Sequence, residues 1–229
     1  LREGFALRET DLASGQVPED ADLLMVVDPS SLDAAQRFAV DQFLMQGGTV
    51  MVATAQFDVD LTGREITAAP AQTGLNDWLA AQGVTLEQAL VMDPQNTPFP
   101  IPVPRRVGGF TVEEIQTLDY PYFPDVRADG LSAATGITAN LGQITMNWTS
   151  PITLDAETGD AETGDADAGA ERTVTRLIES SPDAWTTESP DMQPDFEQYG
   201  RLGFPVGDDR GRKLLAVMVE GRFESAFAG

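Results

Sequence analysis

Two stretches indicate the fold class most directly: Leu-Leu-Met-Val-Val-Asp-Pro-Ser-Ser at residues 23–31 and Thr-Val-Met-Val-Ala-Thr at residues 49–54. Each contains a continuous apolar run bounded by turn residues, which is typical of a strand buried on both faces of a parallel sheet. Between them, apolar residues recur at helical spacing from Ala35 to Leu44, with Ser31 or Asp33 as the cap and Gly47-Gly48 as the end. Strand, helix and strand within about 30 residues predict a right-handed parallel crossover.

The residues on either side of this unit predict shorter elements. Strands are expected at 5–8, 86–92, 144–148, 152–154, 173–179 and 214–219, a short helix at 75–82, and loops at 56–73 and 189–211. The predicted fold class is therefore α/β: a Rossmann-like or flavodoxin-like, mostly parallel sheet with flanking helices, plus antiparallel hairpin additions in the C-terminal half. Residues 1–229 are expected to form a single α/β domain.

Two segments interrupt this pattern. Five prolines between Pro94 and Pro104 predict an extended, polyproline-like course across the surface. Residues 155–171 repeat Ala-Glu-Thr-Gly-Asp and carry seven acids and no base, so we expect a solvated low-complexity loop at a long hairpin tip. From Asp160 the acids fall at positions one, three and twelve, as in a calcium-binding EF-hand loop. Calcium binding stays open, although Asp165 stands where that loop needs glycine.

The charge balance limits the classes of partner. The chain has 37 acids against 14 bases, a net charge of −23, and its only lysine is Lys213. A surface this negative repels nucleic acid and anionic lipid, and it suits a salty exterior as well as an ordinary acidic surface. The sequence shows no run long enough to span a bilayer and no signal peptide. Since it begins at Leu1 without methionine, we expect a fragment of a longer membrane-anchored protein.

The residue inventory excludes many active sites. The chain contains no cysteine and no histidine, so it has no Ser-His-Asp triad, no Cys-His pair and no ordinary zinc site. It also lacks a dinucleotide fingerprint and a P-loop, and a Ser-Lys pair would need Lys213, which opens an apolar strand. Paired carboxylates remain open because acids are abundant. No cofactor and no metal are predicted, and the chain is not expected to be an enzyme.

One position could still bind a ligand. Open α/β sheets place ligands beyond the carboxyl ends of their strands, where this sequence has Asp28, Ser30, Thr54 and Gln56. The alternative is that these residues only form turns and caps. Four aromatic residues could stack on sugars, although such residues more often pack in a core. They are Trp148, Trp185, Tyr120 and Tyr122.

Several motifs, in their order along the chain, resemble a known family. They lie at 17–24, 28–29, 46–52, 75–79, 83–84, 91–93, 120–124, 177–185 and 215–227. Together they resemble the gliding-motility-type auxiliary component of ABC transport systems, over nearly the whole chain except the acidic repeat.

This resemblance implies a fold like class I glutamine amidotransferases and an extracytoplasmic location. It also implies a tether to the inner (cytoplasmic) membrane and, as partners, an ABC permease and ATPase with other envelope proteins. In amidotransferase-like enzymes a cysteine follows the strand that matches residues 49–54, where this chain has Thr54-Ala55-Gln56. The fold would thus be kept and the hydrolysis lost.

The sequence leaves three functions open. The leading one is a non-catalytic extracytoplasmic domain that binds transporter partners or engages cargo. The second is a module that binds a small molecule or glycan in the strand-end crevice, and the third is a carboxylate-based hydrolase. A crevice plugged by side chains, together with exposed apolar patches, would favour the first.

Overall fold

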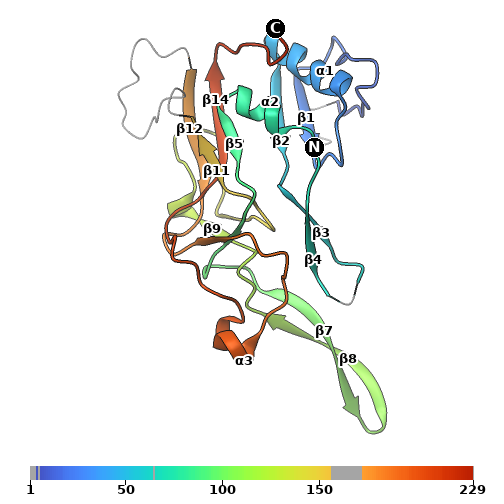
Figure 1. Cartoon of the computed structure of the whole chain (residues 1–229), viewed down its shortest axis with the longest axis vertical. Coiled ribbons are helices and arrows are strands. Elements are labelled where there is room, and N and C mark those ends of the chain that lie inside the picture. The colour runs from blue at the N-terminus through green and yellow to red at the C-terminus, as the bar shows by residue number, and fades with distance from the viewer. Residues whose placement is uncertain (1–3, 5, 64, 156–171, 229) are drawn as a thin grey trace.

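The computed structural model describes residues 4, 6–63, 65–155 and 172–228 (Figure 1). Within these ranges the strands form six small sheets, five of them antiparallel, and helices are few and short. The acidic repeat and its calcium hypothesis fall in 156–171, outside the described residues. Residues 6–8 form no strand, so the strand expected at 5–8 is wrong.

The strand–helix–strand prediction is confirmed. β1 (Leu23–Val27) pairs in parallel with β2 (Thr49–Ala53), and α1 (Ala34–Met45) connects them. Asp33 caps α1 because its side chain accepts a hydrogen bond from Gln36 N while the Gln36 side chain bonds the Asp33 N–H. Gly47, with φ of 90°, follows the helix in a backbone conformation that favours glycine.

The prediction that these strands are buried on both faces is wrong. Leu24 and Val26 of β1 are buried in a cluster with α1, whereas Leu23, Met25 and Val27 on the opposite face are exposed. The reason is that α1 covers one face of this two-stranded sheet and no described residue buries the other. A continuous apolar run therefore predicts a strand here, but it does not predict that both faces of the strand are buried.

The largest sheet is antiparallel and has the order β12–β14–β11–β5. Its strands are β12 (Arg172–Glu179), β14 (Leu214–Gly221), β11 (Ile152–Leu154) and β5 (Val84–Leu86). β14 lies between β11 and β12, so these two strands do not pair with each other as the expected hairpin requires, while residues 156–171 themselves lie outside the described residues.

The Rossmann-like or flavodoxin-like α/β class is consequently wrong, and the amidotransferase-like fold is not shown. A parallel sheet needs a crossover of a dozen or more residues between strands, usually a helix. After β2 the described helices that precede strands of the large sheet are short: α2 (Asn76–Ala81), before β5, has six residues, and α3 (Phe196–Tyr199), before β14, has four. The other short strands pair antiparallel, some with the next strand in the chain and some with a distant one.

Three further two-stranded sheets complete the body of the molecule. They are β3 (Phe57–Asp60) with β4 (Thr67–Pro70), β6 (Leu90–Met92) with β13 (Trp185–Thr187), and β9 (Asp125–Arg127) with β10 (Gln143–Thr145). The first replaces the loop expected at 56–73, and the strand expected at 86–92 is two strands in different sheets. The loop expected at 189–211 contains α3 (Phe196–Tyr199), and two 3₁₀ turns occur at Ala128–Gly130 and Gly200–Leu202.

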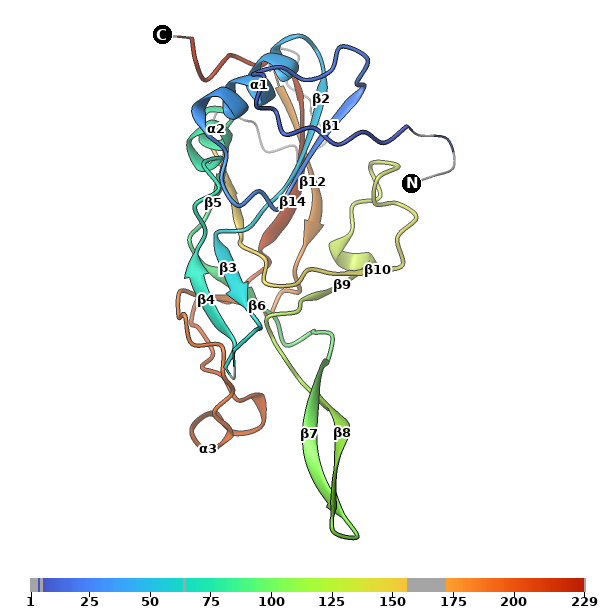
Figure 2. The same ribbon diagram turned by 90° about the vertical axis from the view of Figure 1, so that its right-hand side faces the viewer.

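A long hairpin projects from this body (Figures 1 and 2). It consists of β7 (Phe99–Val107) and β8 (Phe110–Leu118), joined by Gly108-Gly109, and is called the arm below. The polyproline-like course expected for this proline-rich segment is wrong from Phe99 onward, because the segment pairs along its whole length with β8. The two-glycine turn, with φ of 56° and 87°, has the positive dihedrals that a tight hairpin turn requires.

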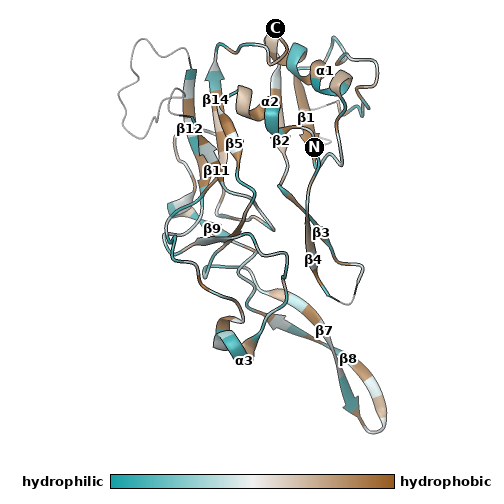
Figure 3. Cartoon of the chain, viewed as in Figure 1, coloured by the Kyte–Doolittle hydropathy of each residue, from teal (hydrophilic) through white to brown (hydrophobic). Residues whose placement is uncertain are grey.

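Three clusters of buried side chains make the core. One lies under α1, one lies against β12 and β14, and one is aromatic and is built on the turn 119–124. Figure 3 shows that hydrophobic residues also occur along β1 and along the arm. No helix among the described residues has the length and apolar character needed to cross a bilayer.

Candidate functional site

The carboxyl ends of β1 and β2 meet, as the parallel pairing predicts. Asp28 directly follows β1, and its N–H donates to the carbonyl of Ala53, the last residue of β2, at 2.8 Å. Thr54 and Gln56 then continue from β2, so three of the four predicted site residues come from this junction. Asp28 has φ of 44°, in the left-handed region that non-glycine residues seldom adopt. Ser30 is exposed farther along the turn.

Gln56 does not face open solvent. It is buried, its N–H donates to Ser150 Oγ at 3.1 Å, and its carbonyl accepts a hydrogen bond from Ala71 N at 2.8 Å. Its side-chain amide exchanges two hydrogen bonds with Asn76, at 2.7 and 3.0 Å. These contacts satisfy the polar groups of Gln56 within the protein, at the position beyond the strand ends where the sequence predicted a crevice.

Thr54 has a different environment. Its hydroxyl is buried and has no hydrogen-bond partner among the described residues. Asp28, by contrast, is exposed, and its carboxylate makes no side-chain hydrogen bond within the same part of the chain. The structure thus brings Asp28, Thr54 and Gln56 to one junction, and ligand binding by them stays a prediction.

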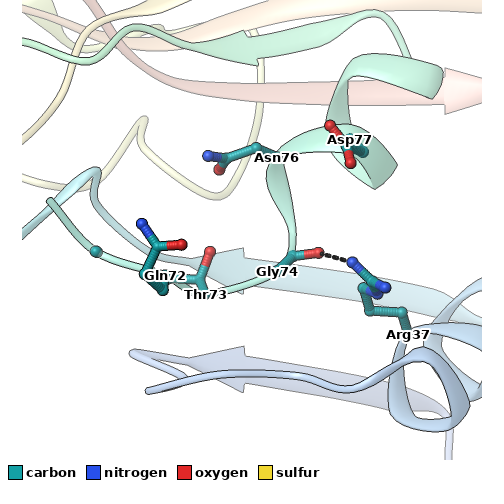
Figure 4. A pocket seen from close by; sticks show the side chains of 7 residues that line it. Arg37, Gln72, Thr73, Gly74, Asn76 and Asp77 are labelled. Carbon is teal, nitrogen blue, oxygen red and sulfur yellow. Dashed lines mark hydrogen bonds between the residues drawn. The ribbon is translucent and has the colours of Figure 1, made fainter.

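A small hollow lies beside this junction (Figure 4), with a volume of about 180 Å³. Its lining residues are Arg37, Ala71, Gln72, Thr73, Gly74, Asn76 and Asp77. Pockets for drug-sized ligands usually measure about 300–1,000 Å³ and are largely apolar. This hollow is smaller and is lined mainly by polar groups, so its size does not favour a ligand site.

The wall of the hollow is held by contacts within the protein. Arg37 Nη1 donates to the carbonyl of Gly74 at 2.9 Å, and Leu32 N donates to the carbonyl of Thr73 at the same distance. Gly74 has φ of 75°, and a Cβ there would lie 2.6 Å from the Leu32 carbonyl oxygen, so only glycine fits. The guanidinium of Arg37 thus supports the loop at Gly74 through this hydrogen bond.

None of the carboxyls with a shifted pKa among the described residues is poised as a general acid. A hydrolase of the carboxylate type needs one carboxyl whose pKa is raised, so that it carries a proton near neutral pH. Among the described residues the shifted carboxyls all have lowered pKa values: hydrogen bonds from Thr62 and Arg212 lower those of Asp60 and Asp129, respectively. At Asp209 desolvation raises the pKa, but hydrogen bonds outweigh it and lower the pKa to about 2. No cluster of metal-ligating side chains occurs in the described ranges.

The aromatic candidates for sugar stacking lie in the core. Tyr120, Tyr122 and Trp185 are almost fully buried, and Trp148 packs edge-on against Phe123 with ring centroids 4.8 Å apart. Burial raises the pKa of Tyr120 to about 12, and burial, followed by the charges of Tyr120 and Asp191, raises the pKa of Tyr122. Both phenols therefore stay neutral and serve packing, which is the alternative that the sequence favoured.

The arm is the feature that the sequence analysis missed. Phe110, Ile115 and Val112 are 76%, 65% and 45% exposed, although each is large and apolar. The signal was present, because Gly108-Gly109 stands between two segments of strand-forming residues, which is a hairpin pattern. The prolines before it drew the prediction toward a polyproline course.

Comparison with known proteins gives a family and no closer relative. Neither the curated proteins nor the solved structures include a significant match to this chain. The sequence model of the family described as "ABC-type uncharacterized transport system" matches residues 1–229. The resemblance to an ABC transport auxiliary component is thereby confirmed, while its gliding-motility subtype stays a prediction. The chain belongs to this family of auxiliary components of ABC-type transport systems.

Proposed function

We propose that this chain is a non-catalytic interaction domain that acts outside the cytoplasm, where it binds the permease and ATPase assembly of its ABC transport system or engages cargo. The observation that carries the proposal is the filled strand-end crevice. Gln56 and Asn76 close on each other there, and the hollow beside them holds only about 180 Å³. A ligand or substrate therefore has little room beyond the carboxyl ends of β1 and β2.

The distribution of apolar side chains supports protein contact. The uncovered face of the β1–β2 pair carries Leu23, Met25 and Val27 from one strand and Met51 from the other, all exposed. Parallel strands are almost always covered on both faces, so an apolar face left open is unusual for an isolated protein. Contiguous exposed apolar surface marks sites of protein contact.

The extracytoplasmic location and the tether to the inner membrane are part of the proposal. They are supported by the family's role in ABC transport and by the net charge of −23. An acid excess of this size is tolerated best in a salty medium, since counterions screen its self-repulsion.

Co-purification of the full-length protein from detergent-extracted membranes tests the proposal. Mass spectrometry is expected to find an ABC permease and an ATPase in stoichiometric amounts. Protease added to intact spheroplasts is expected to cleave the domain, with a cytoplasmic protein as the protected control. Recovery of the protein alone from the soluble fraction would overturn the proposal, and protection from the protease would overturn its location.

A further inference from the structure

The arm is anchored at one end and free over the rest of its length. At its base Phe99 and Leu118 pack against the aromatic core cluster. From there the two strands run outward, beyond the other sheets, to the Gly108-Gly109 turn (Figures 1 and 2). A two-stranded hairpin without a covering layer is marginally stable in water, so an arm of nine paired residues per strand is an unusual surface feature.

The two edges of the arm differ chemically. Residue pairs in an antiparallel hairpin alternate between pairs that exchange two hydrogen bonds and pairs that exchange none. Proline has no N–H, so the pairs of Pro100, Pro102 and Pro104 are the non-bonded ones. The backbone groups of these residues face away from β8. The three prolines thus remove three of the four outward-facing donors of β7, leaving only that of Arg106, and make this edge unsuited to accepting another strand.

The outer edge of β8 keeps its donors. The partners of the three prolines are Thr117, Ile115 and Glu113, and their N–H and C=O groups face away from β7. Within the described ranges no backbone group or side chain hydrogen-bonds to these groups. Natural proteins usually protect exposed strand edges from pairing with another chain. In this arm the prolines protect the edge of β7, whereas the edge of β8 can still pair with another strand.

The side chains on β8 indicate what fits that edge. Phe110 and Val112 point to one face of the arm and Ile115 points to the other, and all three are exposed. Glu114 forms an ion pair with Arg105 at 3.1 Å, but Glu113 makes no ion pair among the described residues. An incoming strand would thus lie beside apolar side chains on both faces and beside one unpaired carboxylate.

We propose that the outer edge of β8 binds an extended segment of a partner protein in the transport assembly, which adds as a third strand to the arm. The partner segment carries apolar residues beside Phe110, Val112 and Ile115 and a lysine or arginine beside Glu113. Main-chain hydrogen bonds supply the binding, and these side chains supply the specificity. The inference rests on the proposed role of the chain as an interaction domain.

Charge complementarity selects a basic partner segment over a second copy of this chain. Two copies paired through β8 would bring two chains of charge −23 together, and their mutual repulsion opposes that pairing. A basic segment is instead attracted by both the local carboxylate and the overall field.

The test uses the full-length protein in its native membrane, with a photoreactive phenylalanine analogue in place of Phe110. Irradiation is expected to cross-link the arm to one of the co-purifying transport proteins, at a peptide that carries a lysine or arginine. The double variant Glu113→Pro and Ile115→Pro removes two outward N–H groups and copies the natural arrangement of Pro104 and Pro102. It is expected to reduce the cross-link about tenfold or more.

A matched variant separates backbone pairing from side-chain contact. Glu113→Ala with Ile115→Ala keeps both N–H groups and is expected to retain much more cross-link than the proline pair. Hydrogen exchange shows whether the arm stays folded, since the inward amides of Val112, Glu114 and Gln116 remain protected in both variants if the hairpin persists. If the proline pair unfolds the arm, the single variant Glu113→Pro takes its place in the comparison.

The outcomes distinguish the two proposals. If permease and ATPase co-purify but the arm gives no cross-link, or a cross-link that the prolines do not affect while the arm stays folded, the inference about β8 is wrong and the interaction role stands. A cross-link to a second copy of the chain or to lipid also overturns it. If nothing co-purifies, the interaction role itself fails.

Discussion

Asp41 is a fully buried carboxylate that joins three parts of the chain. It lies in α1 and accepts hydrogen bonds from Trp78 Nε1 at 3.1 Å, Ser225 Oγ at 2.6 Å and Ala226 N at 3.0 Å. Buried charges are tolerated when they are hydrogen-bonded in this way, because each bond replaces part of the lost hydration. The cluster therefore connects α1 to α2 and to the C-terminal segment.

Asp41→Ala is expected to lower the free energy of unfolding by about 3 kcal/mol, because it leaves the donors of Trp78 and Ser225 without an acceptor. Urea denaturation followed by tryptophan fluorescence measures the change. Asp22→Ala serves as the control, since Asp22 is exposed and makes no hydrogen bond among the described residues; its cost should stay within about 0.5 kcal/mol. Equal costs for the two variants would contradict this role of Asp41.

Asp209 contributes to the loss of folding stability at acid pH. Desolvation raises its pKa, but hydrogen bonds from Lys213 and Thr186 outweigh it and lower the pKa from 3.8 to about 2. Since the folded pKa lies below the unfolded one, this contribution is present above about pH 4 and is lost as the pH falls toward about 2. The carboxylate is half exposed, so screening keeps the effect small.

Asp209→Asn should accordingly flatten the decline of stability between about pH 4 and pH 2, relative to the unchanged protein. Urea midpoints measured across that interval show the difference, and the two proteins should have parallel curves at higher pH. A variant whose acid decline is as steep as that of the original chain would show that Asp209 does not contribute.

At the scale of elements, local patterns predicted only what local residues decide. The unit β1–α1–β2 was predictable because its apolar runs, its cap and Gly47 all lie within the unit. The antiparallel sheets were not predictable, since β5 pairs with β11 across a long stretch of sequence and each has only three residues. Such short strands are selected by tertiary packing rather than by propensity.

The candidate site, too, was predictable only where neighbouring residues determine it. The junction of Asp28 and Thr54 could be predicted from parallel pairing alone. The closure of the crevice could not, because it depends on Asn76 and Ser150, which reach Gln56 from distant segments. In the arm the local signals conflicted, because the alternate prolines favour a polyproline course while the two glycines favour a hairpin. The hairpin forms, since prolines at alternate positions of an edge strand do not disturb its pairing with β8.

The cap of α1 provides a test at this scale. Asp33→Ala removes the side-chain acceptor for the Gln36 N–H, while the backbone N–H at position 33 can still donate to Gln36 Oε1, and it is expected to cost about 1 kcal/mol. Ser31→Ala is the matched control, since the sequence alone left Ser31 as an equal candidate for the cap. Thermal or urea unfolding monitored by far-ultraviolet circular dichroism compares them. A larger loss for Ser31→Ala would show that the helix begins earlier in solution.

For the whole molecule, the charge of −23 is the main long-range term. The ion pairs of the described residues are mostly exposed and so contribute little each. Self-repulsion therefore opposes the folded state, and salt weakens it because the Debye length falls from about 30 Å at 0.01 M to about 3 Å at 1 M.

The urea midpoint is consequently expected to rise with sodium chloride over that range of concentration. Tetramethylammonium chloride should give a similar rise, because screening does not depend on the identity of the cation. A midpoint that stays constant in both salts would show that the acidic surface costs no stability. A rise with sodium alone would indicate specific ion binding instead.

The hydrogen bonds of Asp41 to Ser225 and Ala226 also have a mechanical consequence. These residues follow β14 in the chain, so tension applied at residue 228 reaches the Asp41 contacts before it reaches the pairing of β14 with β12. The load is thereby shared with α1, and β14 is shielded from being peeled from its sheet one residue at a time. A pulling experiment should record an early yield that Asp41→Ala abolishes.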